Sequence, residues 1–164
     1  MTEPHFTRPA TWHDVVDLAR RLNRCGARYV LVGGYALAAH GFVRMTTDID
    51  IAVAPDADNN RRWVAALAEL PDGAAAELAA EEDPFTGDYL HAIRINDEIT
   101  VDIMPSVAGI DFATLAKHAV ILELEDERVP VLDLEGLLLT KLSDRPKDRA
   151  DAELLRAALA RRNR

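Results

Sequence analysis

The sequence predicts an α+β fold, in which a small mixed β-sheet is flanked by helices and followed by a C-terminal helical pair. Short runs rich in Val and Ile, such as 28–32 and 47–54, have the length and alternation of strands. Ala- and Leu-rich runs with helical spacing separate them. The 164 residues match the size of one domain. We therefore expect a single domain over 1–164, with residues 1–132 as the sheet core and 133–164 as the C-terminal helices.

The elements follow one another with recognisable boundaries. Thr11 is expected to cap a first helix that Gly26 ends, and Gly33-Gly34 separates the first strand from a helix over 35–40. After the strand 47–54 we expect two helices, 58–70 and 74–82, and then a hairpin whose strands 89–95 and 99–104 are joined through Asn96-Asp97. A helix 111–118 and two further strands, 119–124 and 128–132, are expected next. The chain is expected to end with a helix 134–142 capped by Asp133 and a last helix beginning at Pro146.

Composition excludes several classes of protein. The net charge of −9 argues against a dedicated nucleic-acid coat, in which basic surface dominates affinity. The single cysteine, Cys25, excludes a disulfide framework and a Cys-based zinc site. The first residues lack an apolar signal core, and no apolar run approaches the ~20 residues that cross a bilayer. We therefore expect a cytoplasmic protein without membrane contact.

Gly33-Gly34 stands between a predicted strand and a predicted helix. Two glycines allow backbone N–H groups to approach an anion closely at a helix N-terminus, which suits a triphosphate. The same pair also suits a plain tight turn, so by itself it does not establish a phosphate site.

Three aspartates interrupt strands that are otherwise apolar. Asp48 and Asp50 are two residues apart, so on a strand they share one face. Asp102 alternates with Val101 and Ile103 in a later strand. Asp is poorly suited to strands, and neighbouring carboxylates repel one another unless a cation lies between them. If the two strands pair, the three carboxylates could hold two divalent ions, and Asp102 becomes a candidate general base.

The run LVGGYALAAHGFVRMTTDIDIAV, followed later by VDIMP, resembles the DNA polymerase beta-like nucleotidyltransferase superfamily. That superfamily has a Gly-Gly or Gly-Ser turn, then Asp-x-Asp, then a third Asp on a neighbouring strand. The sequence departs from this pattern at Gly34 and Tyr35, where a small hydroxyl residue would follow the first glycine. Backbone donors or Tyr35 must then contact the phosphates.

The resemblance implies a minimal nucleotidyltransferase fold and a two-metal reaction. A nucleotide monophosphate would pass from an NTP to an acceptor hydroxyl, and pyrophosphate would leave. The cofactor would be Mg²⁺, as two ions, with Mn²⁺ as a substitute. The implied roles are metal ligation by Asp48, Asp50 and Asp102 and phosphate binding by Gly33 and Gly34.

The C-terminal part resembles the signature of AbiEii/MenT-type toxin nucleotidyltransferases. It contains Lys141 and the run Arg145-Pro146-Lys147-Asp148. The resemblance implies that Lys141 and Asp148 face the nucleotide. Arg44 could neutralise a phosphate or pair with an aspartate. Asp151 is expected to be solvated or to cap the helix.

The acceptor divides the function into alternatives. A toxin-like enzyme would modify a tRNA or a protein and could have a cognate antitoxin. A tRNA would need a basic path, for which 20–28 and 161–164 are candidates. A small antibiotic of the aminoglycoside or lincosamide type is the alternative acceptor, and the acidic stretch 77–83 favours it. A non-catalytic nucleotide-binding or interaction module is the alternative from another class.

Overall fold

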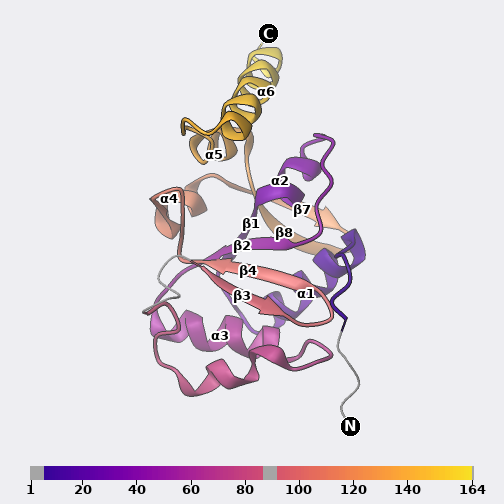
Figure 1. The fold of residues 1–164 in the computed structure, drawn as a ribbon, viewed down its shortest axis with the longest axis vertical. Coiled ribbons are helices and arrows are strands. Elements are labelled where there is room, and N and C mark those ends of the chain that lie inside the picture. Colours follow the sequence, from indigo (N-terminus) through magenta and orange to yellow (C-terminus); the bar gives the residue numbers. More distant parts are fainter. Residues whose placement is uncertain (1–5, 87–91, 164) are drawn as a thin grey trace.

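A six-stranded mixed β-sheet organises the computed structural model, which describes residues 6–86 and 92–163 (Figure 1). Its strand order is β3-β4-β2-β1-β8-β7. The strands are β1 Tyr29–Val32, β2 Ile49–Val53, β3 Ile93–Asn96, β4 Thr100–Met104, β7 Ala119–Leu124 and β8 Glu127–Leu132. A two-stranded ribbon of β5 (Ser106–Val107) and β6 (Ile110–Asp111) follows β4, and the sequence pattern does not predict it. The α+β class is confirmed.

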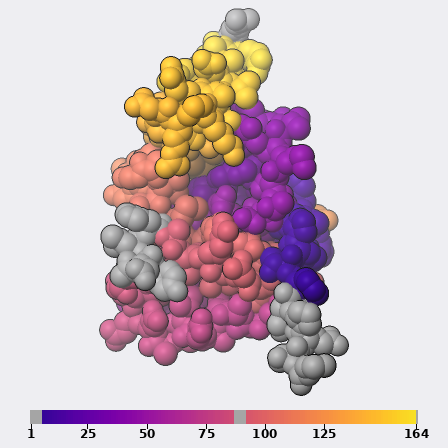
Figure 2. Space-filling view, in the orientation of Figure 1, coloured from indigo at the N-terminus to yellow at the C-terminus, as the bar shows by residue number. Residues whose placement is uncertain are grey.

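The order of helices along the chain also agrees with the sequence. They are α1 Trp12–Arg24, α2 Gly33–Ala39, α3 Ala57–Ala68, the 3₁₀ helix η1 Ala74–Ala80, α4 Phe112–Lys117, α5 Leu134–Leu139 and α6 Pro146–Arg162. In Figure 1, α5 and α6 lie together at one end of the molecule and α3 lies at the other. Figure 2 shows the C-terminal helices standing out from the body. None of the helices in the described ranges combines the length and apolar character needed to cross a bilayer.

Several predicted boundaries differ from those in the structure. The helix α2 begins at Gly33, so the glycine pair forms its first turn and not a separate linker. The helix α5 ends at Leu139, three residues short of the predicted 142, because Thr140 is its C-cap. The first residues of the hairpin strand predicted over 89–95, residues 89–91, lie outside the described residues; the described strand β3 begins at Ile93.

The core lies on one side of β2 and β4. Ile49 and Ile51 of β2 and Val101 and Ile103 of β4 are almost fully buried. Burying each of these side chains stabilises the fold by about 1.5–3 kcal/mol. The residues between them, including Asp50, therefore point to the opposite face. The alternation thus divides β2 and β4 into a core face and a polar face.

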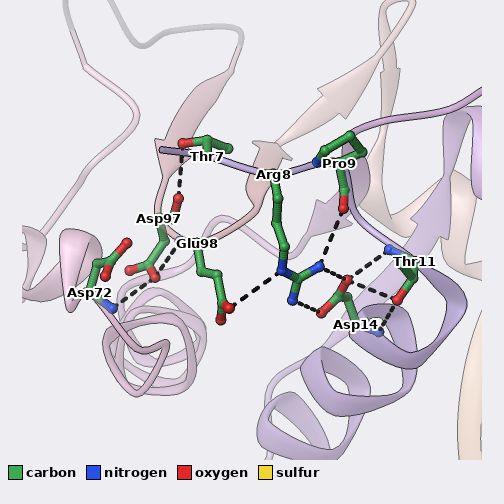
Figure 3. Close-up of polar contacts among 8 residues, drawn as sticks. All are labelled: Thr7, Arg8, Pro9, Thr11, Asp14, Asp72, Asp97 and Glu98. Atoms are coloured by element: carbon green, nitrogen blue, oxygen red, sulfur yellow. Dashed lines mark hydrogen bonds and ion pairs between the residues drawn. The ribbon is translucent and has the colours of Figure 1, made fainter. Parts of the chain in front are cut away.

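An N-terminal strap, residues 7–11, ties the turn between β3 and β4 to α1 (Figure 3). The backbone N–H of Arg8 donates to Glu98 O in the β3–β4 turn (2.9 Å), and that of Ala10 donates to Thr47 O (2.9 Å). Thr47 immediately precedes Asp48. The strap therefore braces the turn between β3 and β4 and the entry into β2.

Asp14 anchors this strap to the first turn of α1. Its carboxylate accepts two 2.7 Å hydrogen bonds from the Arg8 guanidinium, as well as bonds from the Thr11 backbone and hydroxyl. The Thr11 hydroxyl in turn accepts from the Asp14 N–H, which completes a capping box. The Arg8 hydrogen bonds are the main reason that the pKa of Asp14 falls from 3.8 to about 2.

We predict that Asp14→Ala lowers the free energy of unfolding at pH 7 by about 1–2 kcal/mol. Because the folded pKa of Asp14 is depressed, its contribution is present above about pH 4 and is lost as the pH falls towards 2. The measurement is urea unfolding at a series of pH values. Asp58→Asn, which removes an exposed ion pair on α3, is the control. An equal loss for Asp14→Ala at pH 7 and at pH 2 would contradict the role assigned to the ionised carboxylate.

Candidate active site

Three polar residues form a row across three neighbouring strands. The parallel pairing of β2 and β4 sets Asp50 opposite Asp102, and the antiparallel pairing of β3 and β4 sets Asp102 opposite Arg94. Directly opposed residues project from the same face of a sheet. The strand carrying Asp102 therefore lies beside the strand carrying Asp50, which is the pairing that a site of three carboxylates needs. Asp48 immediately precedes β2, because the strand begins at Ile49 and not at 47.

These residues line a cavity of about 340 Å³. Its other lining residues come from the α2–β2 connection and from the C-terminal helices; they include Gly34, Arg44, Thr46, Lys141, Lys147 and Asp151. A neighbouring cavity of about 620 Å³ shares Asp50, Arg94, Asp102 and Lys141 with the first. The site therefore has two compartments that meet at the carboxylates.

Asp50 is the most perturbed member of the carboxylate group. Burial, followed by the negative charges of Asp102 and Asp48, raises the pKa of Asp50 well above its usual range. The positive charge of Arg94 acts in the opposite direction. An ionised Asp50 is therefore unfavourable unless a further cation approaches it.

Arg94 is a site residue that the sequence analysis missed. Its Nε and Nη2 atoms donate to the two carboxylate oxygens of Asp102, at 2.9 and 3.1 Å, and Nη2 also donates to Asp48 Oδ2 at 3.3 Å. The hairpin register contains the missing signal. Once Asn96 pairs with Thr100, Arg94 must stand opposite Asp102.

Carboxylate oxygens are the ligands that Mg²⁺ and Mn²⁺ prefer, so the donor chemistry of the site fits these ions. Asp50 adds a buried carboxylate whose charge is incompletely compensated. In the arrangement that the structure shows, however, the described residues contain no group of three or more His, Cys, Asp or Glu side chains that could hold a metal ion. The Arg94 guanidinium contacts Asp48 and Asp102 instead.

Gly33 makes the close approach of α2 to the carboxylates possible. Its φ is +68°, and a Cβ atom built there would lie 2.2 Å from Asp50 Oδ2. Gly34 is similarly close to Thr46, whose Cβ would lie 2.9 Å from a Cβ at residue 34. The glycine pair is therefore required by crowding against Asp50 and Thr46, whatever it contributes to phosphate binding.

The C-terminal helices supply a basic wall that is organised by Asp151. Lys141 Nζ lies 3.1 Å from Asp151 Oδ2, and the Arg44 guanidinium pairs with Asp151 Oδ1. The side chain of Asp151 is only 4% exposed. The expectation that Asp151 is solvated or caps the helix is therefore wrong. Of the two alternatives for Arg44, the structure shows the aspartate pair, and it also places Arg44 on the cavity wall.

Asp148 lies at the edge of this arrangement. It accepts a 2.6 Å hydrogen bond from the Ser143 hydroxyl and lies 3.6 Å from Lys141 Nζ. The hydrogen bond from Ser143 lowers the pKa of Asp148. Asp148 is not among the residues that line either compartment, whereas Lys147 and Asp151 line the smaller one. Asp151, three residues further along α6, therefore lines the cavity, whereas Asp148 does not.

Tyr35 does not reach the cavity. Its hydroxyl donates a 2.7 Å hydrogen bond to Ala10 O, and its ring packs edge-on against Trp12 at 4.9 Å between centroids. The expectation that Tyr35 could replace a missing hydroxyl residue is therefore wrong. Thr46 and Thr47, directly before Asp48, supply hydroxyls at the cavity instead. The Thr-Thr pair beside Asp-x-Asp is the sequence signal for them.

A larger cavity lies elsewhere. It measures about 780 Å³ and is lined by residues that include Tyr29, Phe112 and Ile121. It contains none of the predicted catalytic, metal-binding or phosphate-binding residues. Size alone therefore does not mark the candidate active site, whereas the converging charges do.

Comparison with known proteins agrees with the geometry. The model of the AbiEii family, described as a nucleotidyl transferase toxin of type IV toxin–antitoxin systems, matches residues 17–150. No curated protein sequence gives a match. Among solved structures, a Thermotoga maritima protein described as a nucleotidyltransferase has a TM-score of 0.60 at 20% identity, covering 96% of this chain and 97% of that one. That likeness shows a shared nucleotidyltransferase fold.

We predict that Gly33→Ala is far more destabilising than Gly73→Ala. Both glycines have a positive φ, but a Cβ at residue 73 meets nothing within 4 Å. Gly73→Ala should lower the free energy of unfolding by about 1 kcal/mol, whereas Gly33→Ala should lower it by about 3 kcal/mol or more because it adds a clash with Asp50. Denaturant titration of the two variants separates backbone strain from crowding. Equal losses would show that Asp50 does not restrict residue 33.

A second prediction concerns the two aspartates of α6. Asp151→Asn should lower the free energy of unfolding by about 3–5 kcal/mol, because it leaves two basic side chains without their buried partner. Asp148→Asn should lower it by about 1 kcal/mol or less, because that carboxylate is more exposed. Thermal and denaturant unfolding of both variants test the difference. A larger loss of unfolding free energy for Asp148→Asn than for Asp151→Asn would contradict the assignment of Asp151 as the main partner of the basic side chains.

Proposed function

Because the chain belongs to the AbiEii nucleotidyl transferase toxin family, we propose that its two-compartment site transfers a nucleotide monophosphate from an NTP to an acceptor hydroxyl with divalent metal ions as cofactors. The observation that carries this proposal is that acidic and basic side chains line one cavity together. Asp48, Asp50 and Asp102 make up its carboxylate wall, and Lys141, Lys147 and Arg44 make up its basic wall. A triphosphate with bound cations needs both kinds of group.

The carboxylate wall is the proposed metal site. Asp48, Asp50 and Asp102 would hold the ions, and the raised pKa of Asp50 supports this because a bound cation would stabilise its ionised form. When bound, divalent ions lower the pKa of an attacking hydroxyl and offset the charge that develops on the phosphates. The family and the fold support enzymatic activity, and we propose that this activity depends on divalent metal ions.

The basic wall is proposed to orient the triphosphate. Lys141 is held by Asp151 and Asp148, so its ammonium is positioned before substrate arrives. Arg44 is fixed by the same Asp151. Such preorganised cations stabilise a developing negative charge without having to reorganise during the reaction. The nucleoside would occupy the larger compartment, where Met104, Val107 and Leu137 provide apolar surface.

The proposed reaction is an in-line substitution at the α-phosphorus. The acceptor oxygen forms a bond to that phosphorus, and the bond from the α-phosphorus to the oxygen that bridges the α- and β-phosphates breaks. The hydroxyl proton passes to the carboxylate of Asp102, which lies between Asp50 and Arg94 in the row. Pyrophosphate leaves from the basic wall.

The acceptor proposed first is a tRNA or protein hydroxyl, and a cognate antitoxin is the proposed partner, because the family is one of type IV toxins. The surface supports a tRNA only weakly. Arg24 pairs with Glu69, Arg28 pairs with Asp56, and Arg20 and Arg21 also contact carboxylates. This predicted basic path is therefore largely neutralised, and this observation keeps a small antibiotic as the second candidate acceptor.

Radiolabelled α-phosphate NTPs, offered with total tRNA, total protein and an antibiotic panel, test the reaction. We expect label transfer that depends on Mg²⁺ or Mn²⁺. Asp102→Asn should reduce the rate by about 10³-fold or more, because it removes a proposed metal ligand and proton acceptor. Asp58→Asn, an exposed substitution on α3, is the matched control and should retain the rate.

The class of molecule that carries the label identifies the acceptor. Absence of label on every acceptor, with all four NTPs and both ions, would contradict the proposed activity and favour a nucleotide-binding module. A near-normal rate for Asp102→Asn would remove that residue from the mechanism.

A further inference from the structure

The Arg94 guanidinium forms ion pairs with Asp48 and Asp102, two of the three carboxylates proposed to hold metal ions. We propose that Arg94 is a positioning residue that serves as the internal counter-ion of Asp48 and Asp102, and that it competes with the metal for their oxygens. The guanidinium would order the carboxylates while no metal is bound and would be exchanged for the ion during loading. This inference rests on the proposed function, because it concerns the same carboxylates.

The contacts of Arg94 define the competition. The guanidinium binds Asp102 through both carboxylate oxygens and reaches Asp48 with the nitrogen that also contacts Asp102. A carboxylate oxygen that accepts a guanidinium N–H has fewer lone pairs available for a metal ion, and the positive charge of the guanidinium opposes the approach of a cation. This explains why three aspartates line one cavity while the described part of the chain contains no ready-made metal group.

Two of the basic residues that line the same cavity form ion pairs with other carboxylates. Lys141 and Arg44 both contact Asp151, and Lys141 also contacts Asp148. Among the described residues, Arg94 is the basic side chain that forms ion pairs with Asp48 and Asp102. Without metal, the repulsion among the carboxylates is therefore offset mainly by one arginine.

The position of Arg94 makes the exchange feasible. It projects from β3, which is an edge strand of the sheet, and its side chain is 59% exposed, whereas that of Asp102 is 16% exposed. An exposed ion pair contributes roughly 0–1 kcal/mol, so a divalent ion can displace the guanidinium into solvent. The tether to β3 keeps the released guanidinium at the boundary of the two compartments, both of which it lines.

A purely structural role for Arg94 predicts the opposite effect on the metal. If Arg94 only held the carboxylates in a ligating geometry, its removal would disorder them and weaken binding of the ion. If Arg94 competes with the ion, its removal frees oxygens and removes a positive charge, so binding becomes tighter. The sign of the change therefore decides between the two roles.

Titration of the full-length protein with Mn²⁺, without nucleotide and followed by the electron paramagnetic resonance signal of free Mn²⁺, measures this sign. We expect Arg94→Gln to lower the dissociation constant about fivefold, the factor that corresponds to losing an interaction of about 1 kcal/mol. Arg62→Gln removes a comparable exposed Arg–Asp pair on α3 and should leave the dissociation constant unchanged. Melting temperatures of both variants establish that they fold.

Arg94→Lys is the second variant, because it keeps the charge but cannot bind both oxygens of Asp102 in the same fork. Its dissociation constant should fall between those of the wild type and Arg94→Gln, and it carries the test if Arg94→Gln fails to fold. An unchanged or weaker affinity in both variants, or no Mn²⁺ binding by any of the proteins, would overturn the inference. Since this titration requires no turnover, it is separable from the label-transfer assay, whose failure would instead overturn the proposed function.

Discussion

The parallel pairing of β2 with β4 is the constraint on which the candidate site depends. It sets Asp50 directly against Asp102, because the register also sets Ile49 against Val101 and Ile51 against Ile103. A shift of one residue would expose the isoleucines and bury the carboxylates. The hydrophobic core therefore fixes the distance between the charged groups, and the repulsion between those groups is tolerated because the buried face stabilises the sheet.

The basic wall depends on a second, separate contact. The helix α6 packs chiefly against α5, and Asp151 on its buried side gathers Lys141 and Arg44 from two other parts of the chain. A carboxylate so poorly exposed needs partners, and both of its partners lie on the cavity wall. The C-terminal helices thus position cations opposite the sheet while adding Leu137 and Leu155 to the same core.

Crowding explains why the site needs its glycine pair, for which the sequence left both a phosphate site and a tight turn open. Gly33 is needed because α2 begins against Asp50, and Gly34 is needed because Thr46 lies beside it. The N-terminal strap completes the packing, since Ala10 binds both Thr47 and the Tyr35 hydroxyl. The side chain of Tyr35 is therefore part of the scaffold, and the hydroxyls at the cavity come from Thr46 and Thr47.

The sequence was sufficient to predict the features that depend on near neighbours. These are the helix caps at Thr11 and Asp133, the alternation of apolar and acidic residues around Asp50 and Asp102, and the α+β order of elements. Local spacing is sufficient for these, because caps and strand faces are set within a few residues. The tertiary structure was needed to show that Arg94 contacts Asp102 and that Asp151, rather than Asp148, pairs with both Lys141 and Arg44. The first contact depends on the register of the β3–β4 hairpin, which local patterning alone does not fix. The second depends on the rotation of α6 against its neighbours, which long-range packing sets.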